Sequence, residues 1–160
     1  MVRGGVERSE TEGMNFSFST EKSGEDKMDN LKRITEEEFQ KRNDGICFAK
    51  GFHAIISCRY IQTWEQLAEA LGNAFQFPMR NEGMDGTWDW LTDLSWLGDR
   101  EEINLYFDRE KELLKSDSAL KEKVFDFFER LVLFWREDVK EAFIAGAAGK
   151  PKQFNVYLVN

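Results

Sequence analysis

The sequence predicts an α/β domain, a small three-stranded parallel sheet packed by helices. Three segments, residues 53–61, 103–107 and 153–159, are rich in the β-branched and aromatic residues that are typical of strands. Stretches with helical periodicity separate them, so the predicted order is strand, two helices, strand, helices and strand. Because each helical crossover brings the chain back in the same direction, neighbouring strands are expected to run parallel.

The first fifty residues are expected to lie outside this domain. Residues 1 to about 27 are rich in Gly, Ser, Glu and Lys and contain few apolar side chains, which is typical of a disordered leader. We therefore interpret residues 1–50 as a mostly disordered N-terminal extension and residues 51–160 as the folded domain.

One short helix is predicted within the extension, near residues 35–42. Thr35 and Glu38 have the spacing of a capping box, in which each residue bonds the backbone amide of the other. Ile34 and Phe39 occupy the two positions of the hydrophobic staple that often accompanies this box.

The segment 53–61 begins the predicted domain. Its middle is almost entirely apolar and β-branched, which is typical of a strand covered on both faces. Thr63 and Gln66 then form a second capping box, and the helix that it starts is expected to end before Pro78.

The next segment, GMDGTWDWLTDLSWL at residues 83–97, is predicted to form a short helix with one acidic side. At about 100° per residue, Asp85, Asp89 and Asp93 fall within an arc of about 80°, and Trp96 falls inside it. Like charges four residues apart weaken a helix, so the row indicates a positively charged partner. A tryptophan among such charges is typical of a binding hot spot, although a solvated acidic face is the alternative.

The negative charge of the chain is concentrated around this segment. The net charge is −8, and residues 81–110 contain nine acidic residues against Arg100 and Arg109. A concentrated field of one sign favours a basic partner and argues against binding to nucleic acid.

Residues 110–145 have helical periodicity, with a break predicted at residues 116–118. The apolar stripe at residues 124–135 extends around more of this helix than one buried face requires. We interpret the stripe as core, and the alternative is a surface for a partner or for self-association.

The sequence favours a cytoplasmic protein that does not enter a membrane. No apolar run approaches the roughly 20 residues that cross a bilayer, and the N-terminus lacks the apolar region of a signal peptide. Without secretion, Cys47 and Cys58 are expected to be reduced core residues.

Catalysis, a metal or a cofactor is not predicted. His53 is the only histidine and opens a predicted strand, and no serine or cysteine has the context of an activated nucleophile. Gly146–Lys150 is only faintly similar to a phosphate-binding loop, because two residues instead of four separate its glycines. The paired carboxylates of residues 81–110 leave acid–base or metal chemistry as a less favoured alternative.

The run Met84–Leu97 closely resembles the second helix of the barstar family, which comprises intracellular inhibitors of barnase-type ribonucleases. Its aspartate, tryptophan and Leu-Thr positions match the family motif. The order of elements from residue 51 to Asn160 also fits the three-stranded parallel sheet of that family. The resemblance therefore covers about two thirds of the chain and implies a barstar-like fold.

This resemblance implies an inhibitor that blocks the basic active site of a nuclease. By position, Asp89 would occupy the pocket that holds a substrate phosphate, Asp85 would support it from one turn earlier, and residues 79–83 would form an adjoining contact loop. A carboxylate can replace a phosphate there because it accepts paired hydrogen bonds from arginine. The predicted partner-binding residues are Asp85, Trp88, Asp89, Asp93, Trp96, Asn81 and Gly83.

The implied partner is a basic ribonuclease of the extracellular type or a nuclease toxin, to which the protein would confer immunity. The chain departs from the family pattern in the contact loop, where Met79 or Arg80 stands in place of a tyrosine. It also has Ile144 after Phe143, where the family has a glutamate. The alternative is a barstar-fold immunity or interaction protein that binds a different basic partner and does not inhibit a ribonuclease.

Overall fold

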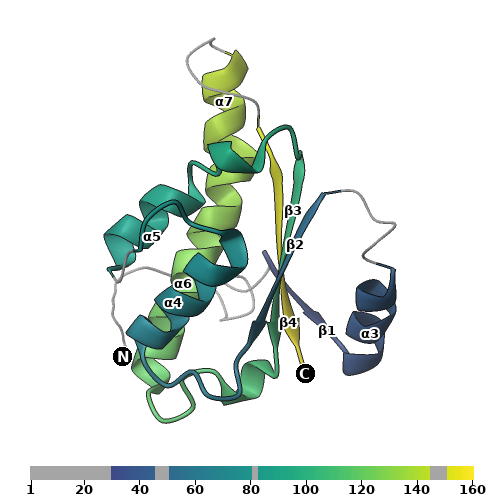
Figure 1. Cartoon of the computed structure of the whole chain (residues 1–160), viewed down its shortest axis with the longest axis vertical. Helices are drawn as coiled ribbons and strands as arrows, with labels where there is room; N and C mark the ends of the chain where they lie inside the picture. Colours follow the sequence, from purple (N-terminus) through teal and green to yellow (C-terminus); the bar gives the residue numbers. More distant parts are fainter. Residues whose placement is uncertain (1–29, 46–50, 81–82, 145–150) are drawn as a thin grey trace, which may run out of the picture.

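The computed structural model of the protein describes residues 30–45, 51–80, 83–144 and 151–160. Within these ranges the chain forms a four-stranded parallel sheet in the order β1-β4-β3-β2, with helices on both of its faces (Figure 1). The strands are β1 (Leu31–Ile34), β2 (Phe52–Ser57), β3 (Glu102–Asp108) and β4 (Gln153–Val159). The helices are α3 (Glu36–Asp44), α4 (Trp64–Phe75), α5 (Met84–Leu91), α6 (Ser118–Leu133) and α7 (Val139–Ile144).

The predicted α/β class and parallel sheet are confirmed, but the predicted number of three strands is wrong. Strand β1 is the fourth strand and pairs with β4 at one edge of the sheet, with Leu31 opposite Val156. Its apolar residues, Leu31 and Ile34, are three positions apart and face opposite sides of the sheet, so the sequence lacks the alternation that indicates a strand. A domain that begins at residue 51 therefore leaves out one strand of the sheet.

Helix α3 covers the face of the sheet opposite to the other helices (Figure 1). Its predicted capping box is confirmed, since the Glu38 amide donates to the Thr35 hydroxyl and the Thr35 amide donates to the Glu38 carboxylate. Phe39 packs beneath the helix with Ile34 and with Tyr106 of β3.

Strand β2 lies at the free edge of the sheet, and the prediction that it is covered on both faces is wrong. Ile55 is 40 % exposed, whereas Ala54 and Ile56 on the other face are buried. The predicted capping box of the next helix is confirmed, because Thr63 and Gln66 bond each other's backbone amides at the start of α4.

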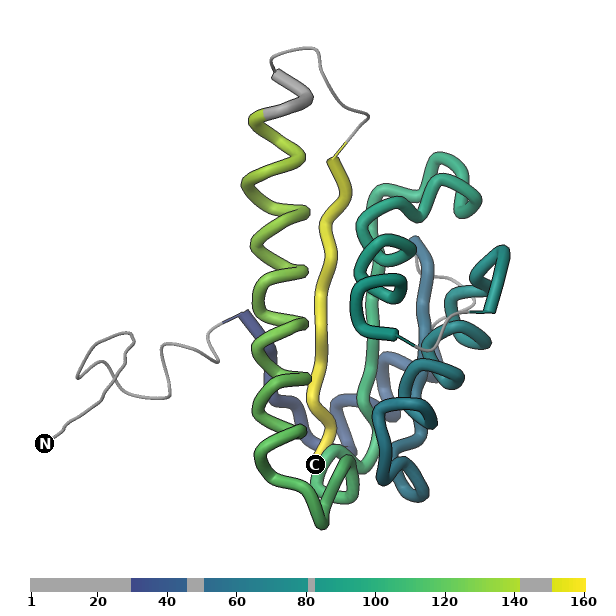
Figure 2. Tube along the Cα trace, turned by 90° about the vertical axis from the view of Figure 1, so that its left-hand side faces the viewer, coloured from purple at the N-terminus to yellow at the C-terminus, as the bar shows by residue number. Residues whose placement is uncertain are grey.

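The main core lies between the sheet and helices α4, α5 and α6. The two central strands bury apolar residues on this face. The ring centroids of Phe107 on β3 and Phe128 on α6 lie 5.1 Å apart. Helices α6 and α7 are joined by a π turn at Phe134–Asp138 and run beside β4 as one long rod (Figure 2). The predicted break before α6 is confirmed, with Asp117 as its N-cap.

A buried ion cluster connects β1 to the helical layer. Glu110, which is only 3 % exposed, accepts a hydrogen bond from Arg33 of β1 (2.8 Å) and forms an ion pair with Lys121 of α6 (2.9 Å). Burial alone would raise the pKa of the Glu110 carboxyl, but the hydrogen bonds from Lys121 and Arg33 hold that pKa below its ordinary value.

Replacing Glu110 with glutamine is expected to lower the free energy of unfolding at pH 7 by about 1–3 kcal/mol, because Arg33 and Lys121 lose their buried counter-charge and one of the two acceptor oxygens becomes a donor. A carboxyl with a lowered pKa stabilises the fold above its ordinary pKa of 4.5, and this contribution is lost as the pH falls through the folded value. The difference between wild type and Glu110→Gln should therefore shrink between pH 7 and pH 3 in urea unfolding. Glu112→Gln is the control, since the Glu112 ion pair with Lys115 spans 3.9 Å at the surface.

Candidate partner-binding surface

Helix α5 carries the two central residues of the predicted surface. It begins after Gly83, whose carbonyl oxygen accepts hydrogen bonds from the Thr87 amide (3.0 Å) and the Thr87 hydroxyl (2.8 Å). Thr87 and Leu91 are fully buried and hold one side of the helix against the core. Asp85 and Asp89 stand one helical turn apart and are both exposed.

The side chains of Asp85 and Asp89 face solvent. Among the described residues, no lysine or arginine forms an ion pair with either side chain. Asp85 lies in the first turn of α5, where the positive end of the helix dipole stabilises an anion. Side chains at this spacing lie about 5–6 Å apart at their Cβ atoms, so the pair offers a compact negative site.

The predicted continuous helix over residues 83–97 is wrong beyond Leu91. The chain turns at Leu94, which adopts the left-handed conformation (φ 53°), and continues as a 3-10 turn at Ser95–Leu97. The Thr92 hydroxyl donates to the Trp88 carbonyl (2.8 Å), which adds a side-chain hydrogen bond to the last turn of α5. Asp93 is therefore outside the helix, and its exposed carboxylate accepts a hydrogen bond from the Ser95 amide at 3.3 Å.

Trp96 does not stand within an acidic arc, contrary to the sequence-based prediction. Its indole nitrogen donates to the Phe75 carbonyl (2.8 Å), and its ring packs edge-on against Phe77 and Trp90 at 6.0 and 5.4 Å. We refer to Phe77, Trp90 and Trp96 as the aromatic cluster. Its members are half-buried, so their rings mainly pack against one another under the surface and only part of each ring is exposed.

Trp88 joins α5 to α6 and is half-buried, as its place on the inner side of the predicted helix implies. The indole packs edge-on against Phe127 (5.4 Å) and Phe134 (6.0 Å). The Arg130 guanidinium lies over the same indole at 5.5 Å from the ring centroid. This contact places one cation of α6 next to the acidic helix, a feature that the sequence did not predict.

The predicted contact loop is only partly described. Asn81 lies outside the described residues. Met79 and Arg80 are exposed, and they border a shallow depression of about 320 Å³ that also includes Phe77 of the aromatic cluster.

A model of the barstar (barnase inhibitor) family matches residues 52–147, which is more than half of the chain. The chain belongs to the barstar family. The match confirms the predicted family, and it starts at the first residue of β2 and includes the whole of α5. Barstar-family proteins are inhibitors rather than enzymes. No curated protein and no solved structure matches the chain.

Trp135 is a buried residue that holds the end of α5, a role that the sequence did not reveal. Its indole nitrogen donates to the Leu91 carbonyl at 3.0 Å, which ties the π turn to the last residue of α5. The apolar stripe at residues 124–135 is mostly core, since Phe127, Phe128, Leu131 and Trp135 are all buried. The unusual width of the stripe was the sequence signal that could have indicated the contact between Trp135 and α5. Self-association through the stripe stays a prediction.

The described residues contain no group of three or more histidine, cysteine, aspartate or glutamate residues that could hold a metal ion. In the same ranges, no helix is long and apolar enough to cross a membrane. Burial raises the pKa of the Cys58 thiol to about 12, so Cys58 remains a protonated core residue near neutral pH. Cys47 lies outside the described residues.

Proposed function

We propose that this barstar-family protein inhibits a basic ribonuclease of the barnase type by placing the Asp85–Asp89 side of α5 in the nuclease active site. One observation carries the proposal: two exposed carboxylates, one turn apart, have no ion pair with any described residue. A charge left unpaired at the surface costs little in water, but it is available to an oppositely charged partner.

The acidic side of α5 and the active site of a ribonuclease have complementary charges. An enzyme that cleaves RNA must hold an anionic phosphate with cationic side chains, and a carboxylate accepts the same bidentate hydrogen bonds from arginine. Asp89 is proposed as the group that enters the phosphate position, with Asp85 beside it. A carboxylate that is buried in the complex favours binding only when a cation of the nuclease pairs with it. The positions of the nuclease cations therefore decide which nuclease is the target.

The anchoring of α5 supports this role. Thr87 and Leu91 are buried, Trp88 packs on α6, and Trp135 bonds the end of the helix. The carboxylates therefore stand on a fixed element, and binding requires little additional loss of conformational freedom.

The remaining predicted residues have lesser proposed roles. Gly83 presents backbone at the start of α5, and Asn81 is the proposed contact of the adjoining loop. Asp93 adds charge beyond the helix end, and Trp96 shapes the neighbouring surface through the aromatic cluster. Trp88 contributes the exposed part of its ring. The proposed setting is the cytoplasm, where such an inhibitor would protect its own cell from the nuclease.

A second candidate function is immunity or binding toward a different basic protein. The packing of Trp96 favours it, because an aromatic anchor predicted for a nuclease contact is engaged within the chain. Both candidates require a basic partner, and only the first requires loss of RNA cleavage.

The decisive experiment is titration of barnase with the purified full chain while cleavage of a fluorogenic RNA is followed. One-to-one loss of activity is the expected result, with lysozyme as a basic protein that is not a nuclease in a parallel binding assay. If the chain leaves cleavage by barnase and by other basic ribonucleases unchanged but binds another basic protein tightly, the second candidate replaces the first.

Association with the ribonuclease is expected to slow at least tenfold when NaCl is raised from about 50 to 500 mM, because salt screens the attraction between separated charges. The barnase–barstar pair is itself the reference example of this steering. Dissociation should change much less, since close ion pairs are screened weakly. Surface plasmon resonance measures both rates, and an association rate independent of salt would contradict a role for the acidic segment.

A further inference from the structure

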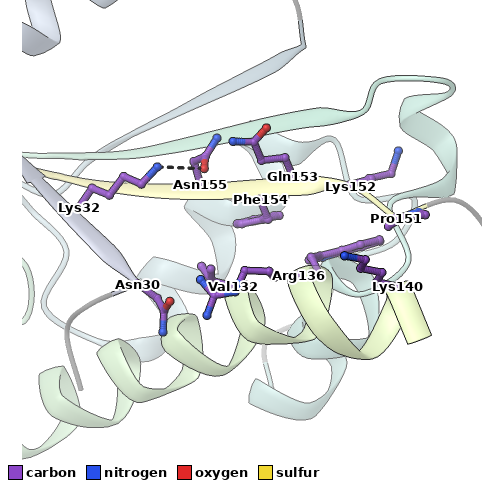
Figure 3. A pocket seen from close by; sticks show the side chains of 11 residues that line it. Asn30, Lys32, Val132, Arg136, Lys140, Pro151, Lys152, Gln153, Phe154 and Asn155 are labelled. Atoms are coloured by element: carbon purple, nitrogen blue, oxygen red, sulfur yellow. Dashed lines mark hydrogen bonds between the residues drawn. The ribbon is translucent and has the colours of Figure 1, made fainter. Parts of the chain in front are cut away.

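A groove of about 460 Å³ lies between β4 and the rod formed by α6 and α7, next to the start of β1 (Figure 3). Its apolar wall is formed by Val132 and Trp135 of the rod and by Phe154 of β4. The groove is separate from the exposed side of α5. Trp135 lies between them, because its ring lines the groove while its indole nitrogen bonds the end of α5.

The polar residues that line this groove are basic or neutral. The basic ones are Lys32, Arg136, Lys140 and Lys152, and the lining includes no acidic residue. This composition contrasts with the net charge of −8 of the whole chain. Arg136 and Lys140 are both exposed on the helical side of the groove (Figure 3). Among the described residues, Lys140 has no ion pair, and Arg136 meets Glu137 only at 3.5 Å.

Among the described residues, no strand pairs with the first three residues of β4 on the side of the groove. Pairing with β1 begins where Leu31 lies opposite Val156, so Gln153, Phe154 and Asn155 precede the paired region. The Asn160 amide donates to the Ile34 carbonyl on the β1 side, and alternate residues of a parallel strand bond the same neighbour. Phe154 therefore directs its amide and carbonyl toward β1, into the groove.

The residue that would bond the Phe154 carbonyl has another partner. In a continuing parallel ladder this donor would be the Asn30 amide. Instead, the Asn30 amide donates to Oε2 of Glu129 (3.2 Å), and the Asn30 side chain donates to Oε1 (2.9 Å). Glu129 thus holds the start of β1 toward α6 and ends the ladder beside Phe154.

We propose that this groove binds an extended acidic peptide segment of a partner protein, which adds to the β4 edge in line with β1. Three residues of β4 provide an opening of about 10 Å at the usual rise of a strand. Main-chain hydrogen bonds to Phe154 would give affinity, and carboxylates directed to Arg136 and Lys140 would select acidic sequences. Because the groove and the exposed side of α5 are separate, the peptide and a nuclease can bind at the same time.

The test uses the full chain and a fluorescein-labelled hexapeptide with blocked ends, Glu-Val-Glu-Val-Glu-Val, followed by fluorescence anisotropy. The double change Arg136→Glu with Lys140→Glu is expected to weaken binding at least tenfold. Lys111→Glu with Lys123→Glu is the matched control, because both lysines are exposed and lie away from the groove. Hydrogen exchange measured by NMR should show that the peptide slows exchange of the Phe154 amide.

Four results would overturn the proposal. The first is equal binding of the Lys-Val-Lys-Val-Lys-Val peptide, and the second is equal loss of affinity in both double variants. The third is slowed exchange at β2 instead of at Phe154. The fourth is a Phe154 amide already protected in the free full chain, which would mean that the chain itself fills the edge. Ribonuclease inhibition by Arg136→Glu with Lys140→Glu should remain intact, which keeps this test separate from that of the proposed function.

Discussion

Replacing Asp89 with alanine is expected to weaken binding to the target ribonuclease by about 30- to 5,000-fold. This range corresponds to the roughly 2–5 kcal/mol lost when one partner of a buried, hydrogen-bonded charge pair is removed, for which the barnase–barstar complex is a reference case. The nuclease cations would remain buried without their acceptor. The dissociation constant from surface plasmon resonance, together with the inhibition titration, measures this effect.

The fold should not be affected by this change. The Asp89 side chain is exposed and makes no ion pair within the described ranges, so the melting temperature is expected to stay within about 2 °C of wild type. Asp89→Asn keeps the shape and removes the charge, and it should bind nearly as poorly. Asp44→Ala removes an equal charge from α3 on the opposite face of the sheet and should inhibit normally. An Asp89→Ala protein that inhibits like wild type would place the contact elsewhere.

The elements that the sequence predicted are those whose signals are local. Both capping boxes form as expected, because Thr35 with Glu38 and Thr63 with Gln66 satisfy backbone amides within one helical turn. Strand β1 was missed because its stability comes from pairing with β4 and from the ion cluster of Glu110, which lies 77 residues away from Arg33 in sequence. Such long-range partners leave no periodic pattern in four residues.

In the candidate site, too, the residues set by local structure were predicted correctly and those set by tertiary contacts were not. Asp85 and Asp89 lie within the regular part of α5, so their spacing of four residues was sufficient to place them on one exposed side. Asp93 and Trp96 follow the left-handed turn at Leu94, and extrapolation at a constant angle fails beyond it. A leucine in this conformation gives no turn signal of the kind that glycine or asparagine gives. The position of Trp96 depends on the Phe75 carbonyl, a tertiary contact.

Trp135→Ala is expected to lower the free energy of unfolding by about 3–5 kcal/mol, because a large buried side chain leaves a cavity that the core fills only in part. The residue is 4 % exposed and packs against Phe134 at 5.4 Å. Loss of the hydrogen bond to the Leu91 carbonyl also releases the end of α5. Urea unfolding at neutral pH measures the loss of stability.

Trp135→Phe separates the two effects, since it keeps an aromatic ring and removes the indole donor. The cost in stability is expected to be about 1–2 kcal/mol, because the buried Leu91 carbonyl loses its partner. Binding to the ribonuclease should weaken about tenfold, because the carboxylates of α5 would lose part of their fixed geometry. Phe39→Leu is the matched control, as it loosens the core beneath α3 on the other face of the sheet. If both variants lose similar stability and neither changes the dissociation constant, Trp135 supports the core alone and does not position the acidic helix.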